Sequence, residues 1–276
     1  MSIPVGATAF GTFNIELDLS GTTVAAADRD AFDQAFNEAA LFWENRVLGY
    51  QSPAIANIVG DLEITVGTAD LGGPFGTLAV AGPTGGTDPA LTGGLVVATR
   101  GFLDVDTADI SRLLAEDRFD DLVRHEMAHV MGFGTLWEFN DLLSDNMLEY
   151  VGAEGVAAYQ REFDSSATFV PVEDEGGPGT AGGHWDEQLF LEFADPSEVT
   201  AAFTGNPELM TGFLNAPTEL SLTTLASFGD LGYVVADSTD GTIPLPPSAL
   251  LLMSAVAALG AAGHRTLRRA AFTRSS

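Results

Sequence analysis

The stretch His125-Glu-Met-Ala-His129 places two histidines four residues apart, with a glutamate between them. On a helix, positions four apart lie on one face and ~6 Å apart along the axis, so both imidazoles can reach one metal ion. Apolar residues flank the pair, and Gly132 follows it, which predicts a buried helix that ends at this glycine. The fold must therefore bury this helix and still leave its histidines accessible to an ion.

The residue next to His125 suggests what such an ion would do. A hydrolytic zinc site commonly uses three protein ligands and keeps one position open for water. Glu126 lies one step round the helix, where it can take a proton from that water. An ordinary charged helix face is the alternative, but only four histidines occur in the chain. We predict one catalytic Zn²⁺ held by His125 and His129, with Glu126 as general base.

The third ligand must come from a distant part of the chain, because Thr135 occupies the nearby position where many such enzymes place a histidine. Two other histidines remain: His184, which follows a glycine-rich stretch, and His264, which lies in a basic tail. A carboxylate from Glu149 or Glu162 is the competing possibility. We favour His184, because the glycine-rich stretch before it can return to the helix.

Composition limits the classes of partner. The 276 residues are 46% hydrophobic, enough for one large domain or two subdomains around a cleft. The net charge is -28 and all eleven basic residues are arginines, which argues against binding of nucleic acid. Calcium sites are possible in so acidic a chain, although no position is indicated. Cysteine is absent, so no disulfide framework exists.

Periodicity and turn residues predict an α+β fold, with a helix packed under a sheet. Strands are expected at 12–19, 61–67, 76–82 and 101–106. Helices are expected at 25–47, from 107–109 through 131, at 144–163 and at 220–231. Residues 93–106 contain material for an exposed edge strand, and residues 172–183 are expected to form a loop.

The C-terminus, residues 239–276, differs from the rest. An apolar run at 249–263 follows a Pro-Leu-Pro-Pro motif and precedes a tail with four arginines. This order resembles the PEP-CTERM class of bacterial sorting signals in its VPLP variant. The resemblance implies a sorting enzyme that processes the segment, and membrane contact through residues 243–263 before processing; a plain membrane anchor is the alternative. Export is expected, although residues 1–20 lack a signal peptide, so we expect the true start to lie upstream.

Four motifs together resemble the leishmanolysin branch of the metzincin zinc metallopeptidases: HEMAHVMGFG, GGHWDE, ELMTGF and LTTLASFGDLGY. The resemblance covers about residues 13–235. It implies that an insertion displaces the third zinc ligand to His184 and that Glu126 is the general base. It also implies that Gly132 allows a sharp turn after the helix, and that Met210 lies in the turn beneath the metal.

The same resemblance implies a metallopeptidase domain at 1–238. Its N-terminal subdomain, about 10–134, would hold a twisted mixed sheet and two long helices, one of which binds zinc. A more irregular, mainly helical subdomain, about 135–238, would lie across the cleft. The expected function is a zinc-dependent endopeptidase that binds a peptide or protein substrate extended along a strand edge. The alternatives are a non-catalytic zinc-containing envelope or matrix protein and a zinc hydrolase of a non-peptide substrate.

Overall fold

The computed structural model describes residues 8–177, 179–187 and 207–236. They belong to the first of two compact units, residues 1–239; the second unit, residues 240–276, lies outside the described residues. The expected sorting segment at 243–263 therefore also lies outside them, and the subdomain boundary near residue 134 stays a prediction. Within the described part, no helix combines the length and apolar character needed to cross a bilayer.

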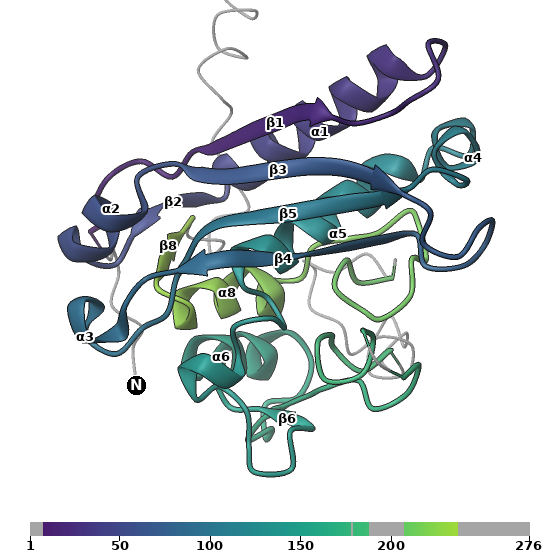
Figure 1. The fold of residues 1–276 in the computed structure, drawn as a ribbon. Coiled ribbons are helices and arrows are strands. Elements are labelled where there is room, and N and C mark those ends of the chain that lie inside the picture. The colour runs from purple at the N-terminus through teal and green to yellow at the C-terminus, as the bar shows by residue number, and fades with distance from the viewer. Residues whose placement is uncertain (1–7, 178, 188–206, 237–276) are drawn as a thin grey trace, which may run out of the picture. The chain divides into compact units, whose positions relative to one another are not determined.

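A four-stranded mixed sheet dominates the N-terminal half (Figure 1). Its order is β1, β3, β5, β4; the first three strands are parallel, and β4 is antiparallel to β5. The strand bounds are Ile15–Gly21 (β1), Leu62–Ala69 (β3), Ala79–Gly86 (β4) and Ala98–Asp106 (β5). All four expected strands are confirmed, with ends shifted by a few residues.

The position of the exposed edge differs from the expectation. β5 is hydrogen-bonded to β3 on one side and to β4 on the other, so it is an inner strand. The interpretation of residues 93–106 as edge-strand material is therefore wrong, and β4 is an outer strand instead. A short apolar run indicates burial but does not give the order of strands in a sheet.

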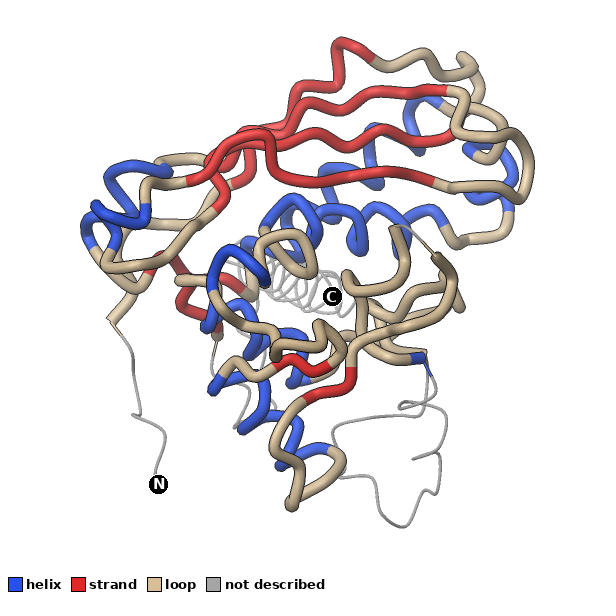
Figure 2. Tube along the Cα trace, turned by 60° about the horizontal axis from the view of Figure 1, so that its bottom comes forward, coloured by secondary structure: helices blue, strands red, loops and turns tan. Residues whose placement is uncertain are grey.

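Two long helices cover one face of this sheet (Figures 1 and 2). They are α1, Arg29–Glu44, and α5, Phe119–Met131. The aromatic stripe expected on the first helix is buried: Phe32, Phe36 and Trp43 are each 0% exposed. Phe32 and Phe36 pack against Phe119 with ring centroids 5.3 and 6.2 Å away. Burial of these rings holds the two helices together.

Helix α5 packs closely against the sheet at Gly101 of β5. A Cβ atom at this position would lie 2.5 Å from Val130 Cγ1 and 2.6 Å from the Gly82 oxygen. Such distances are far inside van der Waals contact, so any larger residue would push the helix away from the strands. The absence of a side chain at Gly101 therefore fixes the position of the helix that carries the histidine pair.

The single helix expected through residue 131 is two helices, so that prediction is wrong in part. α4 covers Ile110–Ala115, and α5 begins at Phe119. Asp117 between them has a φ of 57°, a left-handed conformation that aspartate tolerates better than most residues. The Arg118 amide then donates to the Leu113 oxygen at 3.0 Å, which closes the last turn of α4. The apolar spacing continues through this break, so periodicity does not reveal it.

The chain beyond α5 is less regular. Its elements are η1 (Glu138–Asn140), β6 (Glu149–Tyr150), α6 (Ala153–Glu162), β7 (Val170–Pro171), α8 (Leu222–Asp230) and β8 (Tyr233–Val235). The helix expected at 220–231 is confirmed as α8, whereas only residues 153–162 of the one expected at 144–163 are helical. Earlier residues of that stretch form a turn and β6, which pairs with β7.

Three short elements of the N-terminal half were not expected from the sequence: β2 (Val47–Tyr50), α2 (Pro53–Val59) and α3 (Pro89–Thr92). β2 pairs with β8 and so ties the two halves of the chain together. Together with the mixed sheet and its helices, these elements confirm the expected α+β class.

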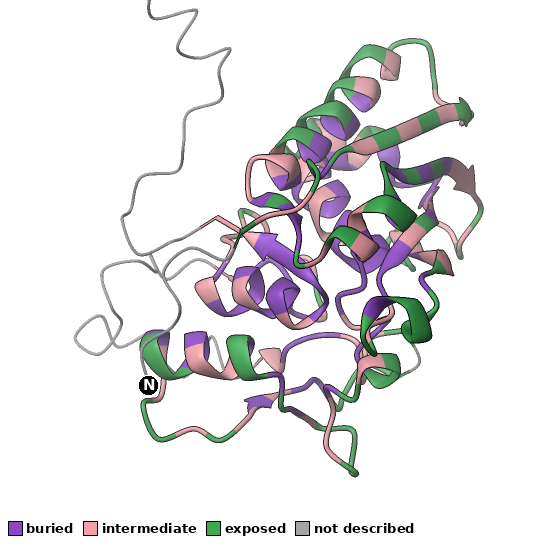
Figure 3. Cartoon of the chain, turned by 90° about the vertical axis from the view of Figure 1, so that its left-hand side faces the viewer, coloured by how far each residue is buried: buried purple, intermediate pink, exposed green. Residues whose placement is uncertain are grey.

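An aromatic cluster fills the interior beneath α5. Phe133, Trp137, Tyr150 and Trp185 are each 0% exposed, and their ring centroids lie 4.7 to 5.1 Å apart. Figure 3 shows that buried residues lie on the inner faces of the helices and strands, with exposed residues on the outer faces. The cluster anchors Trp185, the residue that follows His184, among rings from the segment after α5 and from β6.

Helices α6 and α8 cap each other with the acidic residues at their C-terminal ends. The Glu162 carboxylate accepts hydrogen bonds from the amides of Leu222 and Thr223, both at 2.7 Å, at the start of α8. The Asp230 carboxylate accepts one from the Gly155 amide at 2.9 Å, at the start of α6. Each carboxylate satisfies amides that have no partner within the helix and lies at the positive end of the helix dipole.

We expect Glu162→Gln and Asp230→Asn each to lower the free energy of unfolding by about 1–3 kcal/mol, because each change removes a charged acceptor from amides that are at least partly buried. Urea denaturation gives this difference. Glu63→Gln, on the exposed face of β3, is the control and should change the free energy of unfolding by less than about 0.5 kcal/mol. Unfolding curves for the two cap variants that coincide with the control would contradict the role of the caps.

Candidate metal centre

Helix α5 brings His125 and His129 together as their spacing predicts. Their Nε2 atoms lie 3.0 Å apart, and their ring centroids 4.8 Å apart. His129 is buried and His125 is partly exposed. The helix that carries these two imidazoles packs against the sheet at Gly101, through Val130.

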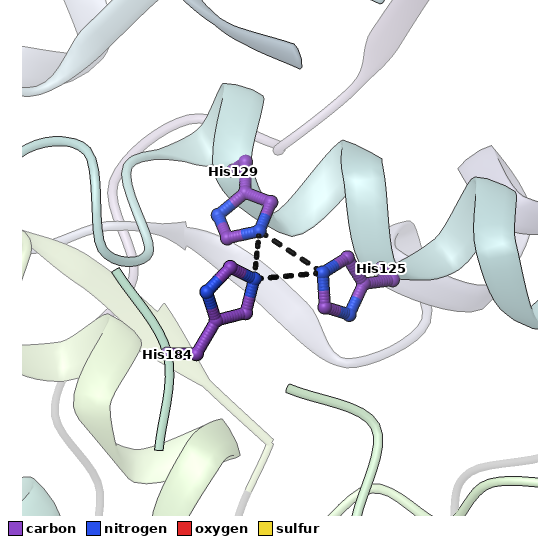
Figure 4. Close-up of side chains that lie close together, drawn as sticks. All are labelled: His125, His129 and His184. Atoms are coloured by element: carbon purple, nitrogen blue, oxygen red, sulfur yellow. Dashed lines mark hydrogen bonds between the residues drawn. The ribbon is translucent and has the colours of Figure 1, made fainter. Parts of the chain in front are cut away.

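His184 joins the pair from a loop 59 positions beyond His125. Its Nε2 atom lies 3.1 Å from that of His125 and 3.0 Å from that of His129 (Figure 4). The loop can lie close to the end of α5 because Gly134 and Gly183, which have no side chains, are in contact. Gly134 has a φ of 69°, and a Cβ atom there would lie 2.1 Å from the Gly183 oxygen. Only glycine at position 134 permits this approach, so Thr135 need not be a ligand.

Each histidine also donates its Nδ1 proton to a backbone oxygen. His125 donates to Leu209 at 2.7 Å, His129 to Phe133 at 2.9 Å, and His184 to Thr180 at 2.8 Å. These bonds fix the ring orientations and place the single proton of each neutral ring on Nδ1.

Burial keeps the three rings neutral. It lowers the pKa of His125 to about 3, it lowers the pKa of His129 well below the usual value, and it lowers the pKa of His184 as well. With their protons on Nδ1, no pair of Nε2 atoms can form a hydrogen bond, although they lie within hydrogen-bond distance. Three nitrogen lone pairs therefore point at a common place, an arrangement that a bound cation stabilises. These residues can hold a metal ion.

The competing carboxylate ligands lie elsewhere. Glu162 caps helix α8, and Glu149 lies in β6, where it pairs with Pro171. Among the described residues, the three histidines are the one group of three or more possible ligands whose atoms converge. No calcium site built from several carboxylates is therefore found in this part of the chain. His264 lies outside the described residues.

Glu126 lies beside the three histidines and lines a cleft of about 780 Å³. It is 7% exposed, and burial raises the pKa of its carboxyl group to about 8. A divalent cation at the histidines would act in the opposite direction, because an opposite charge favours the ionised form. No group among the described residues hydrogen-bonds to this carboxylate, so it can interact with a molecule in the cleft.

The cleft lies between the sheet and the loops beyond α5. Its walls are residues 76–81, which include the start of β4, and the loop residues 179–184 and 212–214. Apart from the histidines on its floor, Glu126 is the one ionisable residue among the described residues that line it. Glycine, alanine and threonine make up most of the walls, which leaves backbone groups accessible to an extended ligand.

Two further residues were expected to shape the site. Gly132 has a φ of 116° and caps the C-terminal end of α5, as its expected role in the turn requires. Met210 is fully buried in the turn 208–211, directly after the residue whose carbonyl oxygen binds His125. Its placement under a metal ion stays a prediction.

Sequence reasoning missed the groups that orient the ligands. Three of them are backbone carbonyls, of Phe133, Thr180 and Leu209, which no side-chain pattern reveals. The fourth is Glu208, a buried carboxylate in the Glu-Leu-Met-Thr motif. The only signal for it was an acidic residue beside apolar ones.

Comparison with known proteins points in one direction. The family profile for leishmanolysin matches residues 96–244, which is more than half of the 276 residues and includes all three histidines. A leishmanolysin homolog of Crithidia fasciculata is 28% identical to this chain over 152 residues. The aligned region covers 50% of this chain but 20% of that homolog, so the chain spans about a fifth of the length of this relative.

We expect His184→Ala to weaken binding of a divalent transition metal by more than ~100-fold, because loss of a ligand should exceed the ~10–100-fold typical of losing an outer hydrogen-bond partner. A competition titration with a chromophoric chelator measures this affinity. Glu149→Gln removes the carboxylate of the competing ligand and should leave the affinity unchanged. The opposite pattern, with metal bound normally by His184→Ala and poorly by Glu149→Gln, would refute the three-histidine site.

Proposed function

Because the chain belongs to the leishmanolysin family of metallopeptidases, we propose that it is a zinc-dependent endopeptidase that uses Glu126 as general base. The convergence of three Nε2 atoms, each backed by an Nδ1–H donor bond, is the observation that carries this proposal. Three neutral imidazoles are a ligand set that suits zinc and leaves a coordination position open.

The spacing of the three nitrogens fits zinc. A triangle with sides of 3.0–3.1 Å has its centre about 1.8 Å from each corner, the side divided by √3. Zinc–imidazole bonds are ~2.0–2.1 Å long, so His125, His129 and His184 would together be able to hold one Zn²⁺. When bound there, Zn²⁺ would lower the pKa of a coordinated water to about 7 and polarise a substrate carbonyl.

The protein's own contribution to hydrolysis is the carboxylate of Glu126. It reaches the cleft and has no hydrogen-bond partner among the described residues, so it can accept a proton from the attacking water. The same carboxyl can then deliver that proton to the nitrogen of the leaving amine. Glu126 is 7% exposed, so few waters can reach its carboxyl group and compete for the proton.

Substrate alignment is proposed to use β4. Residues 79–81 belong to this outer strand and also line the cleft. An extended peptide can pair with the open edge of such a strand through backbone hydrogen bonds, which depend little on sequence. This pairing would place a peptide between the sheet and the loop that carries His184.

Export, and processing of residues 243–263 by a sorting enzyme, are proposed on the sequence pattern alone. The acidic net charge of -28 supports a soluble surface that does not bind nucleic acid.

Glu126→Gln should still bind zinc but lose ~10²–10⁴-fold in kcat, the range typical of a general base. The reason is that the amide cannot take a proton, while the three zinc ligands are unchanged. Hydrolysis of fluorescent casein, with and without a chelator, measures the activity, and a zinc titration measures binding.

The same assays separate the alternatives. Chelator-sensitive cleavage by the wild-type protein supports an endopeptidase. Zinc binding without cleavage of any peptide would favour a binding protein or a hydrolase of other substrates. Full activity in Glu126→Gln would exclude this residue as the base.

A further inference from the structure

Glu208 is a buried carboxylate that the proposed reaction does not use. It is 1% exposed and does not line the cleft. Its partners are the amide of Met210, the amide and hydroxyl of Ser221, and the hydroxyl of Thr224. No arginine forms a salt bridge with it among the described residues, and burial raises the pKa of the carboxyl to about 7. Burial of an acidic group costs free energy unless hydrogen bonds compensate for it. The groups that bind the Glu208 carboxylate therefore indicate its role.

One oxygen of Glu208 acts on a metal ligand through a single peptide unit. The Met210 N–H donates to Oε2 of Glu208, while the carbonyl of the same peptide unit, from Leu209, accepts the Nδ1 proton of His125 at 2.7 Å. A trans peptide is planar and its N–H and C=O point in opposite directions. The carboxylate therefore polarises the carbonyl that orients His125, and it fixes the direction of that carbonyl.

The other carboxylate oxygen of Glu208 is linked by hydrogen bonds to the segment that carries His184. Oε1 of Glu208 accepts the Thr224 hydroxyl proton, and that hydroxyl accepts the indole N–H of Trp185 at 2.7 Å. Trp185 follows His184 directly, and its backbone amide donates to the Met210 oxygen at 3.1 Å. Glu208 thus contacts, through one intermediate on each side, the segments that position His125 and His184.

We propose that Glu208 is a positioning residue for the metal centre, which joins the loop that carries His184 to the carbonyl that orients His125. This inference rests on the proposed zinc site, and it assigns the residue no contact with substrate. Helix α8 contributes the rest of the network, because Ser221 is its N-cap and Thr224 lies in its first turn. The helix N-terminus also stabilises the negative charge on Glu208.

The chain supplies a matched control in Glu162. This carboxylate is also buried and also binds the N-terminal end of α8, but through Leu222 and Thr223, with no link to a histidine. The neighbours Thr223 and Thr224 form a second matched pair. Both side chains are 0% exposed, and their hydroxyls donate to Glu162 and Glu208 respectively.

The test is a zinc titration against a chromophoric chelator for wild type, Glu208→Gln and Glu162→Gln, with urea denaturation of each. Glu208→Gln should weaken zinc binding by ~10-fold or more, in the range for outer hydrogen-bond partners. Glu162→Gln should lose comparable stability and keep its affinity within about twofold. The visible spectrum of the Co²⁺-loaded protein should change in Glu208→Gln alone, because it reports ligand geometry.

Thr224→Val and Thr223→Val keep the test decisive if Glu208→Gln fails to fold. Thr224→Val should weaken zinc binding, and Thr223→Val should not. Unchanged affinity in the Glu208 and Thr224 variants, or equal losses in both members of a pair, would overturn the inference. Zinc binding by wild type without peptide cleavage would refute the proposed function alone, whereas no binding by wild type would refute both.

Discussion

Three hydrogen bonds from imidazole Nδ1–H groups to backbone oxygens decide what the histidine cluster can do. Without them, each neutral ring could place its proton on Nε2, and the three rings could then bond to one another instead of to an ion. With them, every Nε2 presents a lone pair. The accepting oxygens belong to Leu209, Phe133 and Thr180, which lie in three different segments. The chemistry of the site therefore depends on where the fold places these backbone carbonyl groups, and not only on which side chains are present.

Glycines and buried polar contacts deliver those backbone groups. Gly101 lets α5 settle against the sheet, and Gly132 ends the helix in a left-handed conformation, beside the Phe133 oxygen that His129 binds. Gly134 then admits the loop of His184 at a distance that no side chain would permit. The turn that holds Leu209 is fixed by Glu208 on the amide side. His125 is thus oriented by a carbonyl from a distant turn, whereas His129 and His184 each donate to a carbonyl four residues away in the chain.

What the sequence could predict followed from local rules. The spacing of His125 and His129 is a property of any helix, and the scarcity of histidine left His184 as the best third ligand before any contact was known. The sequence did not predict the helix break at Asp117, because a left-handed aspartate depends on tertiary contacts and the apolar periodicity continues through it. The edge position of β4 was not predicted either, because the order of strands in a sheet is set by long-range pairing. Which peptide faces a histidine ring is equally non-local, so nothing in the sequence indicated the role of Leu209, and the one signal for Glu208 was an acidic residue beside apolar ones.

The buried glutamates give an independent reason to assign chemistry to Glu126. This chain has no lysine, and within the described residues no arginine forms a salt bridge with any of the four buried glutamates, Glu126, Glu162, Glu173 and Glu208. Glu162 and Glu208 are instead stabilised by amides and hydroxyls at the start of α8. Glu126 receives no such bond, although a buried carboxylate without partners is destabilising. Glu173 likewise accepts hydrogen bonds from the amides of Glu175 and Glu187. The fold therefore gives hydrogen-bond donors to the other three buried glutamates and leaves Glu126 facing a cleft beside three converging imidazoles, which retains it for a reaction partner.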